Sequence, residues 1–397
     1  MKRMFILFSA VLFVFGCAGE NNNNPENTVV SADLKLELSF GEDESLGDYL
    51  LAAPKDICIS GTGDIYVIDE DRIKIYDNSG NPKQIICKPG QGPGEFEYIQ
   101  FMTLSETGYL TVQGSMFGNT FKIFSPEFEY VSQFSSVNHI PYEGMMENRG
   151  LSPHIPNHVI SFGGSERIYG LESSRKDTGI PEYFLFYESA DGLTKLADYP
   201  GVEESYVRTR DTSLNLQFFG YIYHAVLPGK RAAYTFTAQD RKQENGKWEY
   251  ILHVKSFDGS VHTEISHEYV PVPVTGDDLT IYKKLSQLSE DPVLFETIQK
   301  RVEDKPLKAP LQKLISDGPY VFAVTYTVNE TGEFLIDVFN CDTGKYICST
   351  YFPKNSFSFG AQNFGYIKNG YLYRINRPDD DFPVVEKLRI NPKVYGR

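Results

Sequence analysis

The chain lacks most of the short motifs that mark common enzyme classes. Its five cysteines form no Cys-x-x-Cys pair and its seven histidines no His-x-His pair, so the usual spacings of zinc ligands are missing. There is also no Gly-x-Ser-x-Gly sequence, which carries the nucleophile of α/β-hydrolases. Basic clusters are missing too, and the formal net charge is −15. Phosphates would repel such a chain, so we expect no nucleic-acid partner.

The overall composition is that of a globular protein rich in β-strands. Hydrophobic residues make up 41% of the chain and charged residues 23%, which excludes a wholly disordered or fibrous protein. There is one tryptophan, against 26 tyrosines and 28 phenylalanines. Abundant tyrosine and phenylalanine favour strands. The length of 397 residues would allow two or three domains, although an all-β propeller of this size stays a single domain.

The only long apolar run at a chain end is the N-terminal one. It extends from Met4 to Phe15 behind the basic pair Lys2-Arg3. It is too short to span a bilayer, which needs about 20 residues, and it fits the core of a secretory signal. The following sequence, Val14-Phe15-Gly16-Cys17, resembles the lipobox of bacterial lipoproteins, although Phe15 is larger than usual there. The resemblance implies cleavage before Cys17 and lipidation of Cys17. The alternative is an ordinary signal peptide with an incidental cysteine.

A polar segment follows the lipobox. Residues 18–27 include four consecutive asparagines and cannot bury a core, which indicates a flexible tether. Lipoproteins that are retained at the inner membrane carry aspartate at the position of Ala18. The resemblance therefore favours the outer membrane as the location of this protein. We therefore expect a signal peptide over residues 1–16, a lipidated tether over 17–32 and one domain over 33–397. The lipid would anchor that domain in the bacterial cell envelope.

The middle of the chain repeats a four-strand unit. The clearest copy runs from Pro54 to Phe96 and contains four short strand-like runs with turn residues between them. Ile65 and Val67 alternate with other residues as in a half-buried strand. Glycine, asparagine and aspartate between the runs supply tight hairpin turns. A second copy begins at Met102, about 46 residues on. Four antiparallel strands at this spacing are typical of a β-propeller blade.

Weaker copies continue to the C-terminus and bring the total to six blades. The later copies begin near His158, Gly220, Leu314 and Ala361. The last copy offers only three strands, whereas the alternating run from Asp33 to Phe40 has no blade of its own. We expect this N-terminal strand to complete the last blade and close the ring, which removes exposed strand edges. Five or seven blades are alternatives, because the loop-rich stretches 135–157 and 202–219 are hard to place.

The first copy also resembles an NHL-type blade. It carries the family's order of motifs: Gly-Asp-Ile-Tyr-Val-Ile-Asp over 63–69, Asp-Arg-Ile-Lys-Ile-Tyr-Asp over 71–77 and Gly-Gln-Gly-Pro-Gly-Glu-Phe over 90–96. The whole chain resembles the bacterial six-bladed propeller lipoproteins sometimes called TolB-like. The match is specific over one blade and diffuse elsewhere. It implies an all-β, six-bladed propeller of four-stranded antiparallel blades. It transfers no catalytic residue, because propellers host many functions and these relatives mostly lack an assigned activity.

A helical insert, residues 277–304, interrupts the β pattern before the fifth blade. Apolar residues recur there at steps of three or four: Leu279, Tyr282, Leu285, Leu288, Leu294, Ile298 and Val302. This spacing predicts helices over 277–288 and 291–302. Asp277 or Asp278 would cap the first, and Pro292 suits the start of the second. The insert could cap one mouth of the ring or dock a partner, but we expect its apolar face to pack on blade four or five.

The first strand of each blade lines the channel of a propeller, so polar residues there are site candidates. Lactonase-like propeller enzymes hold a divalent metal in the channel with carboxylates and an asparagine. Four residues of these types lie near strand starts: Asp56, Asn157, Asp317 and Asn363. Their more common role is in a turn, and neighbours such as Ile57 and Cys58 are apolar. We therefore predict no catalytic residue, no metal ligand and no cofactor.

Two residue pairs carry further alternatives. His262 and Glu264 could share one face of a strand, either as solvated residues or as a metal-binding pair. Cys341 and Cys348 flank a turn-like segment. An oxidising compartment would permit a disulfide between them. Diagonal positions across a hairpin are marginal for the required Cα separation of under about 7 Å, so this disulfide stays open.

These observations predict a monomeric, lipid-anchored binding module of the bacterial envelope. It would present its ring mouth and loops to a protein or glycan partner, whose identity the sequence does not give. The alternative is a metal-dependent hydrolase or lyase with a lactonase-like site in the channel. Three or four carboxylate or histidine side chains meeting at the channel mouth would favour the enzyme. An apolar channel would count against it.

Overall fold

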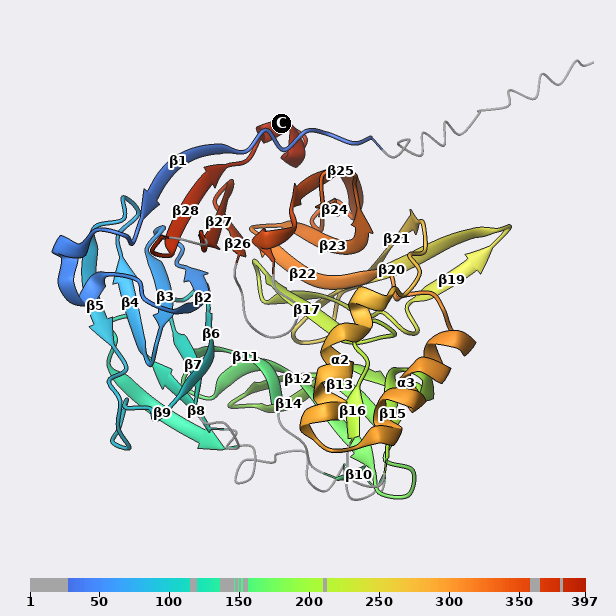
Figure 1. Cartoon of the computed structure of the whole chain (residues 1–397). Helices are drawn as coiled ribbons and strands as arrows, with labels where there is room; N and C mark the ends of the chain where they lie inside the picture. The colour runs from blue at the N-terminus through green and yellow to red at the C-terminus, as the bar shows by residue number, and fades with distance from the viewer. Residues whose placement is uncertain are drawn as a thin grey trace, which may run out of the picture.

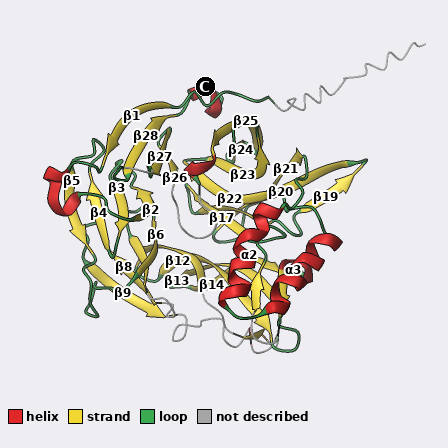
Figure 2. Ribbon diagram, in the orientation of Figure 1, coloured by secondary structure: helices red, strands yellow, loops and turns green. Residues whose placement is uncertain are grey.

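The computed structural model describes residues 28–114, 120–135, 146, 149, 151–152, 156–209, 213–357, 365–378 and 381–397. Among these residues, six antiparallel sheets of four or five strands are arranged in a ring, and one two-stranded sheet and a few helices are added to them (Figures 1 and 2). The all-β, six-bladed propeller is therefore confirmed, and five or seven blades are excluded. The predicted signal peptide, Cys17 and most of the tether lie outside the described residues.

The first two blades follow the clearest sequence repeats. Blade one contains β2 (Pro54–Ile59), β3 (Ile65–Asp69), β4 (Arg72–Tyr76) and β5 (Pro82–Ile86). Blade two contains β6 (Ile99–Leu104), β7 (Leu110–Gly114), β8 (Thr120–Phe124) and β9 (Tyr130–Ser135). Strand order in both sheets follows chain order. The turn between β2 and β3 holds Gly63 at φ 91°, a conformation that glycine adopts without steric cost.

Blades three and four are larger than expected. Blade three contains β10 (Leu151–Ser152), β11 (Pro156–Gly163), β12 (Glu166–Arg175), β13 (Pro181–Ser189) and β14 (Gly192–Tyr199). Blade four contains β17 (Ile222–Leu227), β18 (Arg231–Phe236), β19 (Arg241–Glu244), β20 (Lys247–Ser256) and β21 (His262–Tyr269). The long strand β12 pairs with both β10 and β11, and β20 pairs with both β19 and β21. A small hairpin, β15 (Tyr206–Arg208) and β16 (Ser213–Asn215), lies between these blades in sequence.

Blade five has the expected four strands, and blade six is completed from the N-terminus. Blade five contains β22 (Leu311–Asp317), β23 (Tyr320–Val328), β24 (Glu333–Asn340) and β25 (Lys345–Pro353). Blade six contains β26 (Gly365–Lys368), β27 (Tyr371–Asn376), β28 (Val384–Arg389) and β1 (Lys35–Phe40). Strand β1 pairs antiparallel with β28, with Leu36 opposite Leu388 and Phe40 opposite Val385. The predicted ring closure by the N-terminal strand is confirmed.

The helical insert is also confirmed, although the N-cap of its first helix differs from the one expected. Helix α2 is Gly276–Leu288 and helix α3 is Pro292–Asp304. Thr275 is the N-cap of α2, and Asp278 completes a capping box with it. Asp291 caps α3, which begins at Pro292 as predicted.

Only part of the predicted apolar face of α2 is buried. Leu279 and Tyr282 pack in a cluster with Phe218 and with Tyr326 of β23, so the insert covers blade five and the segment around the β15–β16 hairpin. Leu285 and Leu288, expected on the same face, are 39% and 83% exposed. An α-helix has 3.6 residues per turn, so successive three-residue steps drift around its surface. Residues 279 and 288 therefore lie on opposite sides of the helix.

The four described cysteines are free, buried thiols. Val338 faces Cys348 across the β24–β25 ladder, whereas Cys341 lies in the turn beyond the ladder. The two sulfur-bearing side chains pack in different hydrophobic clusters, so the disulfide considered from the sequence does not form. None of the helices in the described ranges has both the length and the apolar character needed to cross a bilayer.

Candidate functional site

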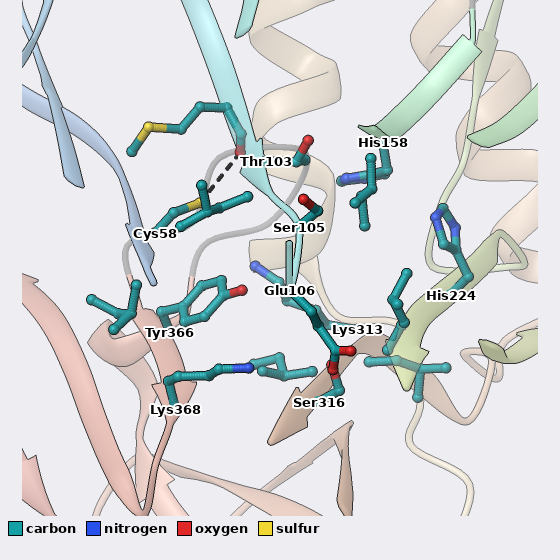
Figure 3. A pocket seen from close by; sticks show the side chains of 18 of the residues that line it. Cys58, Thr103, Ser105, Glu106, His158, His224, Lys313, Ser316, Tyr366 and Lys368 are labelled. Carbon is teal, nitrogen blue, oxygen red and sulfur yellow. Dashed lines mark hydrogen bonds between the residues drawn. The ribbon is translucent and has the colours of Figure 1, made fainter. Parts of the chain in front are cut away.

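A pocket of about 150 Å³ lies at the centre of the ring (Figure 3). The first strand of five blades and β11 of blade three all contribute to its lining. Apolar side chains such as Ile59, Met102 and Leu314 form much of the wall. The titratable side chains in the lining are Cys58, Glu106, His158, Tyr223, His224, Lys313, Tyr366 and Lys368. Because six separate blades supply this lining, the pocket exists only in the closed ring.

Lys313 of β22 places a cation in the channel wall. Burial lowers the pKa of Lys313 to about 8, while the nearby Asp56 and Cys58 act in the opposite direction. Asp56 is fully buried and accepts hydrogen bonds from the backbone nitrogens of Ile57 and Met102, each at 3.0 Å. A lysine with a pKa of about 8 is mostly protonated at pH 7. The wall thus holds an ammonium group backed by a buried carboxylate.

His158 and His224 form a neutral pair in the same wall. Their ring centroids lie 6.1 Å apart in a T-shaped arrangement. Burial lowers the pKa of His158 to about 4 and that of His224 to about 3, so neither carries charge at pH 7. The His224 ring hydrogen-bonds to the backbone of His158, and its Nε2 is buried without a hydrogen-bond partner in the described residues. Neutral imidazole has one donor and one acceptor nitrogen, so Nε2 is left as an acceptor.

A β-bulge sets the position of His158. The register between β11 and β12 shifts between Asn157 and Ile160. His158 itself has φ 50°, in the left-handed region that non-glycine residues rarely adopt. Bulges redirect side chains and are common next to functional sites. Figure 3 shows the His158 ring directed into the pocket, where the bulge places it beside His224.

The charges of the described lining favour an anionic ligand. Lys313 and Lys368 are the two lysines in the lining, and Glu106 is its one carboxylate. Glu106 is exposed to solvent, whereas burial raises the pKa of the Tyr366 hydroxyl and keeps it protonated. The lining itself thus presents two lysines and one exposed carboxylate, with the Asp56 carboxylate buried behind Lys313. It can offer an ammonium group, a hydroxyl donor and the His224 acceptor to one ligand.

The candidates chosen from strand starts do not meet in the channel. Asp317 accepts hydrogen bonds from the backbone nitrogens of Asn369 and Gly370 at 2.8 and 2.9 Å. It also accepts one from the Tyr395 hydroxyl at 2.8 Å, so it fixes the β26–β27 hairpin to blade five. Asp56 is occupied by backbone groups, as described above. The side chain of Asn157 and all of Asn363 lie outside the described residues.

A lactonase-like metal site does not fit the described channel residues. Such a site needs several carboxylate or histidine ligands around one point. The described lining supplies one exposed carboxylate, Glu106, and two histidines, His158 and His224, and these three do not come together within the reach of one ion. Within the described ranges, three such side chains come together only at His253, His262 and Glu264, on the outer strands of blade four. His262 and Glu264 thus do share a strand face, and His253 joins them from β20.

Lys313, His224 and Lys368 are not predicted from the sequence. No motif surrounds them, because each comes from a different blade and the ring alone brings them together. Each lies on the first strand of its blade, as expected for channel residues. A comparison of polar residues on first strands, without a requirement for carboxylates, would have identified them.

The fold and the pocket together define a six-bladed β-propeller with a ligand-sized pocket at its centre. Three solved structures are similar in architecture. A Bacteroides fragilis protein thought to be exported is 12% identical, with a TM-score of 0.49, over 92% of this chain and 98% of its own. A gluconolactonase of Xanthomonas campestris is 11% identical, with a TM-score of 0.40, over 93% and 99%. Regucalcin, a calcium-binding protein of Agrobacterium tumefaciens, is 9% identical, with a TM-score of 0.37, over 86% and 91%.

These values are too low to transfer a function to this chain. No family model matches the chain, and no curated protein is significantly similar to it in sequence. Membership of the NHL-type or TolB-like families therefore stays a prediction.

Proposed function

We propose that this protein is a non-catalytic binding module of the bacterial envelope. Its central pocket would receive an acidic group of a protein or glycan partner. The lipobox-like sequence ending at Cys17 and the polar tether behind it support a lipid anchor, with the outer membrane favoured by Ala18. A rigid ring on a flexible tether can reach partners near the membrane without leaving it.

The observation that carries the proposal is that the Lys313 ammonium and the unpartnered Nε2 of His224 line the same pocket. A carboxylate can bind the ammonium, and a neighbouring hydroxyl can donate to the imidazole acceptor. The apolar wall suits the carbon face of a sugar ring. A uronic acid has a carboxylate, neighbouring hydroxyls and an apolar ring face. An acidic glycan therefore fits the pocket better than a neutral one. A protein partner would have to insert an acidic side chain or its C-terminal carboxylate.

Binding of glucuronate, measured by calorimetry with glucose as the neutral comparison, tests this proposal. We expect glucuronate to bind and glucose to bind at least tenfold more weakly. Lys313→Met should weaken glucuronate binding by about tenfold or more, because a hydrogen bond to a charged group contributes about 1.5–3 kcal/mol. Lys345→Met is the matched control, since Lys345 is an exposed lysine of β25 far from the pocket lining. Equal effects of the two substitutions would contradict the proposal.

The pH dependence gives a second, independent check. Only protonated Lys313 attracts a carboxylate, so glucuronate affinity should be constant up to about pH 7 and fall as the pH rises through the lysine pKa of about 8. His158 and His224 stay neutral above about pH 5, because their pKa values are about 4 and 3. The profile should therefore show no inflection near pH 6.5. An affinity that changes there, and not above pH 8, would assign binding to other groups.

A further inference from the structure

Blade four carries a second cluster of ligand-type side chains, away from the channel. The cluster consists of His253 on β20 and of His262 and Glu264 on β21, the outermost pair of strands in that sheet (Figure 1). His253 lies opposite Glu264, and His262 lies opposite Lys255, two residues along. Side chains two residues apart share one face of a strand, so all three ligand-type groups project to the same side.

The separations within the cluster match those between ligands of one small metal ion. His253 Nδ1 lies 3.0 Å from His262 Nε2 and 3.5 Å from the nearer oxygen of Glu264. All three ligand atoms lie within 4.8 Å of one another. Tetrahedral zinc with bonds of about 2.0–2.1 Å holds its ligands about 3.3 Å apart. A zinc ion could thus contact all three groups with small side-chain movements.

A buried carboxylate orients His253 for this role. Asp240 is 8% exposed, and its Oδ2 accepts hydrogen bonds from the Tyr199 hydroxyl and the Phe236 backbone nitrogen, both at 2.7 Å. Its other oxygen lies 3.1 Å from His253 Nε2, a close contact that does not meet the geometry of a hydrogen bond. A carboxylate there favours the proton on Nε2, which leaves the lone pair of Nδ1 facing His262 and Glu264. Metal-binding histidines usually have such a carboxylate on their second nitrogen.

The surroundings hold the His253 ring in place and leave the site accessible. The ring stacks on Tyr234, with centroids 5.1 Å apart and planes 22° apart. Lys255, which lies opposite His262, donates to the carbonyl oxygen of Leu196 at 3.0 Å. His262 and Glu264 are exposed, so an ion can enter from solvent and keep one coordination position for water or a further ligand.

We propose that His253, His262 and Glu264 form a binding site for a zinc ion, supported from behind by Asp240. Two imidazoles and one carboxylate suit zinc, whereas calcium and magnesium prefer oxygen ligands alone. The ion would join β20 to β21 at the outer edge of blade four. This site is separate from the central pocket and does not depend on the proposed function.

Zinc titration of the untagged full chain, in competition with a chromophoric zinc indicator, tests the site. We expect one strong equivalent in the wild type and its loss in His262→Ala, a change at an exposed residue that should not disturb folding. Glu264→Gln should weaken binding at least tenfold. Glu268→Gln is the matched control on the same strand and should leave it unchanged, because Glu268 pairs with Lys247 at 2.8 Å. The proposal would be overturned if the wild type bound no zinc, or if His262→Ala left zinc binding unchanged.

Cobalt substitution gives a readout of geometry. A four-coordinate site with two imidazoles and one carboxylate should give the intense visible absorption of tetrahedral cobalt, and His262→Ala should abolish it. If the wild type showed the weak absorption of octahedral cobalt and no intense band, that spectrum would contradict the assigned ligand set.

Discussion

We expect Phe40→Ala to lower the free energy of unfolding by about 3–5 kcal/mol, the usual range for removing a buried phenylalanine. Phe40 is the last residue of β1 and is 9% exposed. Its ring centroid lies 4.6 Å from that of Tyr76 in blade one. The side chain therefore joins the last strand of blade six to the first blade. The flanking backbone is held in two β-ladders, so it cannot readily fill the space that alanine would leave.

Leu36→Ala is the matched control for this prediction. Leu36 lies on the same strand but is 57% exposed, so its loss should change the free energy of unfolding by about 0.5 kcal/mol or less. Urea unfolding followed by circular dichroism gives both values under the same conditions. The free energy of unfolding could fall by less than about 1 kcal/mol in Phe40→Ala, or by no more than in Leu36→Ala. Either result would refute the reasoning that Phe40 stabilises the contact between blade six and blade one.

Gly80 approaches the same ring from blade one and allows a second test. It has φ 81°, and a Cβ atom added there would lie 2.8 Å from Phe40 Cδ1. Gly80→Ala should therefore destabilise the protein through both backbone strain and this clash. In the Phe40→Ala background only the strain is left, so the same substitution should cost less there. Equal costs in the two backgrounds would show that the contact does not exist in solution.

Two further predictions concern the buried ion pair of blade one and the anchor. Lys74 Nζ lies 2.6 Å from Asp69, and both side chains are almost fully buried. Lys74→Met should therefore lower the free energy of unfolding by about 3–5 kcal/mol, because it leaves Asp69 as an unpaired buried charge. Lys122→Met, at the corresponding position of blade two, should cost less in the same urea assay, since Lys122 donates to the backbone carbonyl oxygens of Gly92 and Glu95. Cys17→Ala should move the protein from the membrane to the soluble fraction of cells, and an unchanged distribution would contradict lipid anchoring.

The sequence predicted the blades best where turn chemistry is strongest. In blade one, glycine, asparagine or aspartate lies between every pair of consecutive strands, and the four expected runs became four strands. The stretch 202–219 gave no such pattern, because the two strands of its hairpin have only three residues each. Tertiary contacts also determine where β12 ends. This strand runs to Arg175 and pairs there with β10, which is too short to show a periodicity of its own.

The central pocket could not be predicted in the same way. Asp56 was a reasonable candidate by residue type, but two backbone N–H groups occupy its carboxylate. Lys313 lies in an otherwise unremarkable strand, and only ring closure brings it near residues of blade one. His224 became a candidate through an unpaired nitrogen, which depends on three-dimensional contacts and has no signature in the sequence. Strand periodicity is local, whereas the chemistry of this pocket is assembled from six distant segments.

The pairing of β1 with β28 also determines when the ring can close during synthesis of the chain. β1 is made before all the other described strands and β28 after them, yet Leu36 pairs with Leu388. Contacts between such distant segments carry a high closure entropy and form slowly. A chain that stops before residue 384 would leave both β1 and β27 with unpaired edges, which are templates for association with other chains. We therefore expect truncated products to aggregate more readily than the full chain.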